Sequence, residues 1–204
     1  MKINALILSG AALIVLNVAP VFAQQTDTSS TPSNPPTINQ RKENQQDRIA
    51  NGVQSGQLTA GETKNLETKE AGINKEEAGM RAEDNGHLTS TDRSLINKQQ
   101  NHLSNQIYDD KHNANTAHYG NNEVGQRREN QQDRIAQGIK SGQLTAGETA
   151  RLERQQQSIN HEDASMRAAN GGKLTNGDKQ VLNHRLNNAS KNIYRDKHNG
   201  RTQK

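Results

Sequence analysis

The sequence has no cysteine and no tryptophan, and its one phenylalanine, Phe22, lies near the N-terminus. The absence of cysteine excludes a disulfide scaffold and a cysteine-ligated zinc site. Hydrophobic residues make up 28% of the chain and aromatic residues 2%. This composition excludes a membrane-embedded body and a large enzyme core. It does not require disorder, because a net charge of +4 is too small for the usual disorder signature.

The chain also has few prolines, and all four lie at or before Pro36. Proline breaks helices because it lacks an N–H donor and its ring clashes with the preceding turn. Its absence from residues 37–204 leaves long helices possible throughout that part of the chain. Residues 24–37 are rich in Ser, Thr and Pro and have no apolar period, which predicts a flexible tether.

The first 23 residues have the pattern of a secretory signal peptide. Lys2 supplies a positive start, residues 3–18 are apolar, and Val21 and Ala23 stand at the −3 and −1 positions of a cleavage site. A membrane anchor is the alternative, but the apolar run is shorter than the ~20 residues that span a bilayer, and Pro20 follows it. We therefore predict cleavage after Ala23, no membrane span in the mature protein, and export to the periplasm or the extracellular space.

An internal repeat organises the rest of the chain. Residues 40–113 return as residues 126–199 at a constant offset of 86, with about 42 of 74 positions identical. The segment between them, 114–125, is polar and rich in Gly and Asn, which is typical of a linker. We therefore predict two homologous domains, residues 38–113 and 126–199, with a short tail at 200–204.

Each copy contains the motif Gly-x-Leu-Thr-x-x-acid twice, at an offset of 30. The Thr and the acid form a capping box at a helix N-terminus, where the acid also interacts favourably with the helix dipole. The Gly suits the left-handed position that closes the preceding helix. The four motifs begin at Gly56, Gly86, Gly142 and Gly172.

Apolar residues recur at helical spacing after these caps, as in Leu66, Ile73 and Met80, and predict the buried faces of amphipathic helices. Asn74 and Asn160 resemble weaker caps and predict one further helix start in each copy. We therefore predict an all-α fold with two tandem four-helix domains, each a pair of helix-loop-helix units.

These loops resemble EF-hands, the paired helix-loop-helix calcium modules. The loop of that family has Gly sixth, an aliphatic residue eighth, a hydroxyl or acid ninth and an acid twelfth, and the four motifs match these positions. The resemblance implies low-affinity binding of Ca²⁺ or another divalent or trivalent cation. Loop two has the most oxygen ligands. Its candidate ligands are Glu83, Asn85, Thr89 and Asp92, and the other acids at the twelfth position are Glu62, Glu148 and Asp178.

The first half of the loop departs from the EF-hand pattern. The first, third and fifth positions should supply side-chain oxygens, but loops two and four begin with Arg81 and Arg167. The capping boxes and their glycines also explain the motif without any ion. The sequence leaves both interpretations open.

Other combinations of chemical groups do not indicate an enzyme. Tyr108, Asp110 and His112 recur in the second copy, but their spacing does not place all three on one face of a helix, and a helix end accounts for them. The chain has no HExxH motif, nucleophile elbow, phosphate-binding loop or dinucleotide fingerprint. We therefore predict no catalytic residues and no enzymatic activity.

The charged residues point to a solvated surface. Carboxylates alternate with Lys and Arg at helical spacing, which is typical of exposed helix faces. The interleaved charges and the lack of aromatics argue against specific nucleic-acid binding and leave an anionic envelope polymer as an alternative partner.

The polar block RxENQQDRIA occurs at residues 41–50 and again at 127–136. It forms an interaction surface, or packs on Tyr108 and His112 of its own copy, or is identical only because the duplication is recent. The sequence as a whole predicts an exported, non-enzymatic binding or structural protein. Its partner would be an unknown protein or an envelope polymer, and its oligomeric state stays open.

Overall fold

A computed structural model describes residues 35–203. The predicted signal peptide and most of the predicted tether lie outside the described residues. The described part is all-α, as predicted, and no strand occurs in it. None of its helices is long and apolar enough to cross a membrane. The six helices are α1 (Ile38–Gln54), α2 (Ala60–Glu83), α3 (Ser90–His112), α4 (Glu123–Lys140), α5 (Ala146–Ala169) and α6 (Asn176–Lys197).

The prediction of four helices in each copy is wrong, because each copy has three. Asn74 and Asn160 start no helix and lie inside α2 and α5, which run unbroken for 24 residues each. The buried face of α2 continues across Asn74 from Ile73 to Glu77, so burial of this face stabilises one long helix. The single glycine nearby, Gly72, costs a helix only about 1 kcal/mol.

The predicted capping boxes are confirmed at all four motifs. Thr59, Thr89, Thr145 and Thr175 each accept a hydrogen bond from the backbone N–H three residues later, and each acid reaches back to the capping residue. A fifth box, formed by Thr37 and Gln40, starts α1 and has no counterpart at α4, which Asn122 caps.

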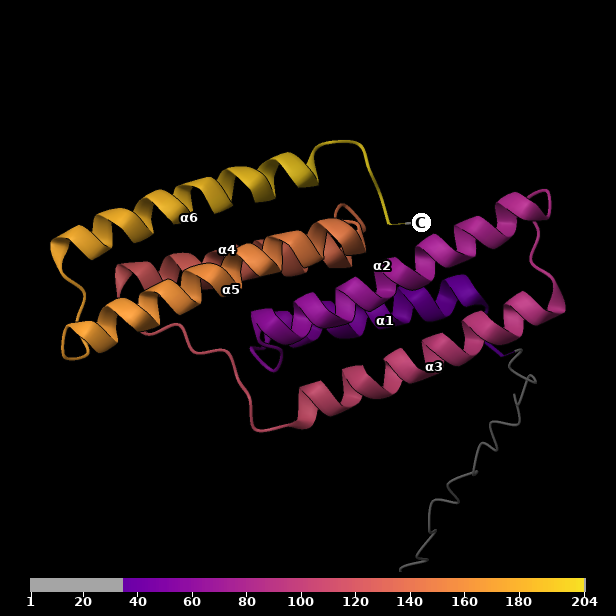
Figure 1. The fold of residues 1–204 in the computed structure, drawn as a ribbon, viewed down its shortest axis with the longest axis horizontal. Coiled ribbons are helices and arrows are strands. Elements are labelled where there is room, and N and C mark those ends of the chain that lie inside the picture. The colour runs from indigo at the N-terminus through magenta and orange to yellow at the C-terminus, as the bar shows by residue number, and fades with distance from the viewer. Residues whose placement is uncertain (1–34, 204) are drawn as a thin grey trace, which may run out of the picture. The chain divides into compact units, whose positions relative to one another are not determined.

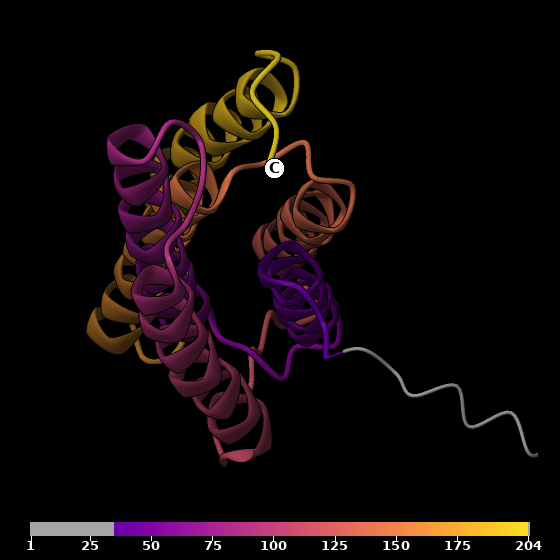
Figure 2. The ribbon, with the colours of Figure 1, turned by 90° about the vertical axis from the view of Figure 1, so that its right-hand side faces the viewer.

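The two copies form one compact unit over Pro36–Lys204 and not two separate units. The most extensive helix contacts join equivalent helices, α2 with α5 and α1 with α4. Figures 1 and 2 show α1 beside α4 and α2 beside α5, and Figure 1 shows α3 and α6 at opposite edges. The first and second helices of copy 1 (residues 38–113) thus meet their counterparts in copy 2 (126–199), and the third helices lie outside, as in a dimer with twofold symmetry.

The hydrophobic core reflects this pairing because its main cluster crosses between the copies. It joins Ile49 and Val53 of α1 to Ile135 and Ile139 of α4, and it includes leucines of α2 and α5. A smaller cluster lies inside copy 2 alone. Its members are Val124, Ile159, Leu182, Leu186 and Ala189. The few apolar side chains of the two copies therefore form one shared core.

The pseudo-twofold axis passes near the middle of α2 and α5. Lys64 Nζ donates a hydrogen bond to Gln157 Oε1 at 3.2 Å across this contact. Because Gln157 is the equivalent of Ala71, the midpoint of the contact falls beside Glu67. Glu67 and its counterpart Glu153 therefore lie near the axis.

Candidate functional site

The acid of loop one, Glu62, is held by several donors of its own copy. Its Oε2 accepts hydrogen bonds from the backbone N–H and the hydroxyl of Thr59, at 2.9 and 2.7 Å. Its Oε1 accepts from the side-chain amides of Asn113 and Asn115, at 2.8 and 3.0 Å. Burial raises the pKa of Glu62, but these hydrogen bonds outweigh it and hold the pKa below its usual value.

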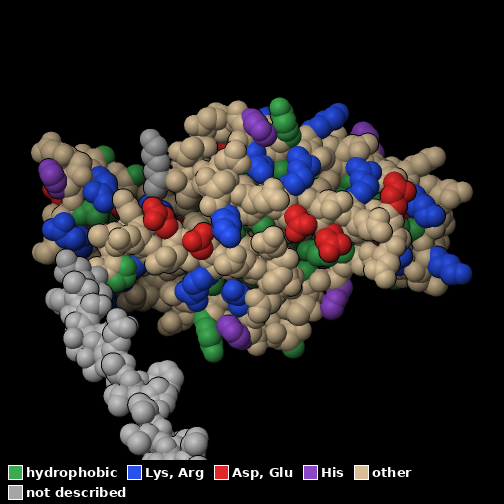
Figure 3. Space-filling view, turned by 180° about the vertical axis from the view of Figure 1, so that it is seen from behind, with side chains coloured by type: hydrophobic (Ala, Val, Ile, Leu, Met, Phe, Trp, Pro, Cys, Tyr) green, Lys and Arg blue, Asp and Glu red, His purple; other side chains and the backbone are tan. Residues whose placement is uncertain are grey.

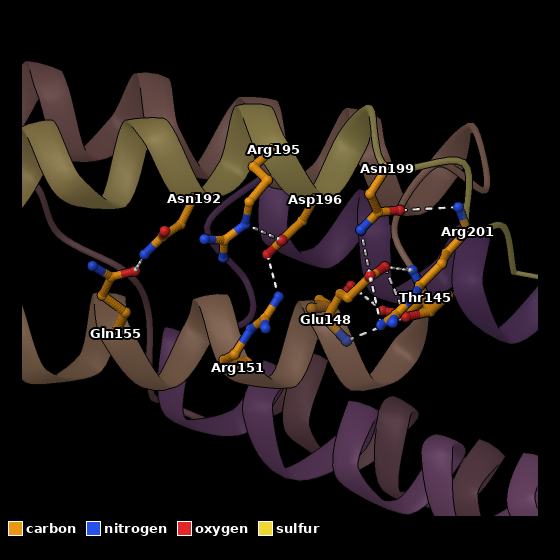
Figure 4. Close-up of polar contacts among 10 residues, drawn as sticks. Thr145, Glu148, Arg151, Gln155, Asn192, Arg195, Asp196, Asn199 and Arg201 are labelled. Atoms are coloured by element: carbon orange, nitrogen blue, oxygen red, sulfur yellow. Dashed lines mark hydrogen bonds and ion pairs between the residues drawn. The ribbon is translucent and has the colours of Figure 1, made fainter.

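Loop three repeats this arrangement, as Figure 4 shows. Glu148 Oε2 accepts from the N–H of Thr145, and its Oε1 accepts from Asn199 at 2.8 Å and lies 3.8 Å from Arg201. Burial raises the pKa of Glu148, but the hydrogen bonds and Arg201 bring it below its usual value. In both copies, then, the segment after the third helix returns to the cap of the second helix.

The acids of loops two and four are bound by their own caps. Asp92 accepts from the N–H of Thr89 at 2.8 Å and from its hydroxyl at 2.6 Å. Asp178 accepts from Thr175 N–H at 2.8 Å and from the amide of Asn170 at 3.0 Å. The hydrogen bonds from the capping threonines lower the pKa of both acids.

The other predicted ligands of loop two, Glu83 and Asn85, are not part of the Thr89–Asp92 cap. Glu83 is the last residue of α2 and is exposed. Asn85 has φ 51° and Gly86 has φ 89°, so a two-residue left-handed turn separates α2 from the Thr89–Asp92 pair. Across residues 35–203, no group of three or more His, Asp or Glu side chains is placed to hold a metal ion. The cation site stays a prediction.

The tyrosines at the ends of α3 and α6 pack on histidines one turn later. The Tyr108 and His112 ring centroids lie 4.1 Å apart, and those of Tyr194 and His198 lie 4.2 Å apart. Both tyrosines are exposed, at 58% and 62% of their surface. We call these two features the Tyr–His stacks.

The aspartate of the same sequence pattern does not join the stacks in copy 2. Asp196 is only 2% exposed and lies between Arg151 and Arg195, to which it is ion-paired (Figure 4). The predicted separation of the aspartate from the Tyr and His by the helix geometry is thus seen directly.

Half of the polar block RxENQQDRIA is buried in each copy, including both of its glutamines. Gln45 Nε2 donates to the Gln100 carbonyl oxygen of α3 at 2.6 Å, and Arg48 donates to Ser104. The equivalent pairs of copy 2 are Gln131 with Leu186 and Arg134 with Ser190. The block therefore joins the first helix of each copy to the third. None of these hydrogen bonds reaches the Tyr–His stacks.

The second glutamine of the block reaches a buried carboxyl group. Gln46 Nε2 donates to Glu67 at 3.2 Å, and Gln132 Nε2 donates to Glu153 at 3.0 Å. Both glutamates have no exposed surface. Burial raises the pKa of Glu67 well above its usual value and that of Glu153 to about 8, while the two glutamine hydrogen bonds lower them.

Sequence reasoning missed these carboxyl groups because it assigned the carboxylates that alternate with Lys and Arg along the helices to solvated faces. A third, Glu70, also has no exposed surface, and burial raises its pKa to about 7. One feature of the sequence could have identified Glu67 and Glu153. Glu67 is identical in both copies, whereas its next three neighbours all differ.

The chain matches no protein-family model, and no curated protein or solved structure is significantly similar to it.

Proposed function

We propose that this chain is an exported, non-enzymatic helical repeat protein with a binding or structural role in the cell envelope or the extracellular space. One observation carries the proposal. The buried glutamines of the polar block that the copies share bond within the fold, whereas the Tyr–His stacks remain exposed at equivalent positions. A surface feature that is repeated in this way suits contact with a partner at two points.

The chemistry of the Tyr–His stacks supports contact with another molecule. Tyrosine offers a large apolar ring with a polar tip and is enriched at protein interfaces for that reason. The chain has three tyrosines, and Tyr108 and Tyr194 are two of the four large hydrophobic side chains exposed in the described part. The other two, Leu95 and Val181, are also equivalent to each other, so the two copies present the same exposed features.

The placement of the perturbed carboxyl groups supports a non-enzymatic role. A catalytic acid or base must lie within hydrogen-bond reach of a substrate. Glu67, Glu70 and Glu153 have raised pKa values but no exposed surface. The loop acids are engaged by helix caps, so these carboxyl groups support the fold.

The charge pattern favours short-range contacts over long-range attraction. Figure 3 shows Lys and Arg side chains interleaved with Asp and Glu on the face opposite that of Figure 1. Mixed charges produce no extended field of one sign, which steering by an anionic polymer would need. A partner that contacts aromatic rings therefore fits this surface better.

Site-specific crosslinking tests the proposal. A photoreactive amino acid replaces Tyr108 or Tyr194 in the full-length protein, and producing cells are irradiated. Ser94 and Gln180 are matched controls. Both are exposed, and each lies about 20 Å from the tyrosine on the same helix. We expect one common adduct from positions 108 and 194 that is absent from 94 and 180. Equal adducts at all four positions, or none at any, would contradict the proposal.

Export is tested on the same material. N-terminal sequencing of the protein recovered outside the cytoplasm should begin at Gln24. A protein that begins at Met1 and stays in the cytoplasm would contradict export.

A further inference from the structure

The linker between the copies fills a slot on copy 2. Ala117 N–H donates to the Gly56 carbonyl oxygen at 2.9 Å, and Tyr119 then packs against the start of α4. The Arg128 guanidinium carbon lies 5.5 Å from the centre of the Tyr119 ring, a cation–π contact. Gly125 permits this approach, because a Cβ there would lie 1.9 Å from the Tyr119 carbonyl oxygen.

The surroundings of Tyr119 combine burial with charge of both signs. Burial raises the pKa of its hydroxyl above the usual value. Glu153, Glu129 and Asp133 raise it further, and Arg128 opposes them. The slot on copy 2 is therefore an aromatic site with one cation over the ring and carboxylates around it.

Copy 1 has the equivalent slot, and no residue in the described range 35–203 fills it. A cavity of about 250 Å³ lies between α1 and the end of α4, whereas one water needs only about 10–15 Å³ by this measure. The lining residues Lys42, Glu43 and Asp47 are the equivalents of Arg128, Glu129 and Asp133. Within the described residues, no aromatic ring lines this cavity.

The backbone path to the slot is also repeated. Gln203 N–H donates to the Gly142 carbonyl oxygen at 2.9 Å, as Ala117 does to Gly56. Two buried polar atoms at the cavity have no hydrogen-bond partner, namely Gln46 Oε1 and Gln203 Nε2. The equivalent oxygen beside the filled slot, Gln132 Oε1, is unpaired as well, so the two slots present the same buried group.

We propose that the open slot of copy 1 binds a tyrosine side chain of a partner polypeptide, in the way that the slot of copy 2 holds Tyr119. The inference deepens the binding role proposed above and rests on it. The internal occupant defines the ligand class: a phenol ring beneath the cation, presented by an extended segment. Lys42 takes the place of Arg128 at the cation position.

One difference between the slots predicts how the affinity can be changed. Asn39 stands in copy 1 where Gly125 stands in copy 2. A side chain at that position overlaps the carbonyl oxygen of a segment placed like Tyr119. The partner segment must therefore shift to enter, and Asn39→Gly should tighten binding, whereas Asn39→Trp should block the slot.

The probe is a blocked hexapeptide with the sequence of residues 116–121, titrated into ¹⁵N-labelled residues 24–204 and followed by NMR. We expect amide shifts at Gly142 and Lys140 that saturate, and an affinity about fivefold or more higher for Asn39→Gly (about 1 kcal/mol). The same peptide with alanine in place of tyrosine should give no shifts. Asn39→Trp should lose binding but keep its melting temperature.

Three results would overturn the proposal. The first is no binding by either the wild type or Asn39→Gly, and the second is equal binding of the alanine peptide. The third is concentration-dependent self-association that Tyr108→Ala or Tyr194→Ala abolishes, which would make the occupant a second copy of this chain. Failure here leaves the crosslinking at the Tyr–His stacks unaffected, so the two proposals can fail separately.

Discussion

The two copies share their helices and their contacts but differ at one buried position beside the pseudo-twofold axis. In copy 2, Gln156 Nε2 donates to Gln131 Oε1 at 2.9 Å. In copy 1 the equivalent residue is Glu70, which makes no hydrogen bond to Gln45, and Gln45 Oε1 has no hydrogen-bond partner. An amide donates a hydrogen bond at this site, whereas a carboxyl group can do so only when it is protonated. At this position, therefore, copy 1 carries a group that titrates, whereas copy 2 does not.

The largest expected effect is an unusual dependence of stability on pH. Glu70 and Glu153, with pKa values of about 7 and about 8 in the folded state, bind protons more tightly there than in the unfolded chain. Their contribution is complete below the unfolded pKa near 4.5 and is lost as pH rises through 7 and 8. At roughly 1.4 kcal/mol per pKa unit, the free energy of unfolding measured in urea should fall by roughly 6 kcal/mol between pH 5 and pH 9.

Repulsion between neighbouring carboxyl groups adds to this loss of stability at high pH. Glu67 is near both Glu70 and Glu153, so each new negative charge disfavours the others, while Lys42 partly offsets the charge on Glu70. Stability that rises from pH 5 to pH 9 would contradict the account.

Exchanging Glu70 and Gln156 between the copies tests whether charge at this position causes the difference. At pH 8, Glu70→Gln should stabilise the protein by about 1–3 kcal/mol, because the new amide can donate to Gln45 and the charge at this position is removed. The reverse exchange, Gln156→Glu, should destabilise copy 2 by a similar amount. At pH 5 both substitutions should have little effect. Equal effects at the two pH values, measured by urea unfolding, would show that charge at this site is not the cause.

Glycine substitutions should affect the two copies alike where their packing is the same. A Cβ at Gly52 would lie 2.7 Å from Leu58, and one at Gly138 would lie 2.6 Å from Leu144. Alanine at either position should cost about 1–3 kcal/mol through overpacking. Gly72 is the matched control, because a Cβ there meets nothing within 4 Å. Gly72→Ala should stabilise the helix by about 0.5–1 kcal/mol. Thermal melting of the three variants checks the ranking.

Calcium should have the smallest effect, if loop two binds it as predicted. A Ca²⁺ concentration equal to the dissociation constant stabilises a fold by about 0.4 kcal/mol. Residues 24–204 should therefore melt slightly higher in millimolar Ca²⁺ than in chelator, and the joint change Glu83→Ala and Asp92→Ala should remove the difference. A shift that survives in this double variant would place the site elsewhere, and no shift up to tens of millimolar would end the prediction.

Local features of the fold could be predicted from the sequence, but the pairing of helices could not. The threonine caps followed from short-range chemistry, because Thr59 and Glu62 are three residues apart. The apolar stripes showed which helix faces are buried without showing what covers them. The contact of α2 with α5 joins residues about 90 positions apart, and nothing local specifies it. Asn74 misled because a cap-like residue cannot end a helix whose buried face continues past it.

The buried polar groups were unpredictable for a related reason. Glu67 and Glu70 have the composition of an exposed face, and their burial depends on Gln46 and Lys42 from another helix. A buried carboxyl group is tolerated only when such partners or protonation compensate for lost hydration. The slot of copy 1 likewise has no local sequence pattern, because its lining comes from α1, the end of α4 and Gln203.

The central claim is that the two copies fold as one unit through contacts between equivalent helices. Urea unfolding of ¹⁵N-labelled residues 24–204 at pH 6, followed by the amide signals of Gly56 and Gly142, tests it most directly. These glycines are equivalent and lie in different copies, so each reports on its own half. We predict that both native signals disappear in one transition with the same midpoint. Two transitions with separate midpoints would show that the copies fold independently and would contradict the account.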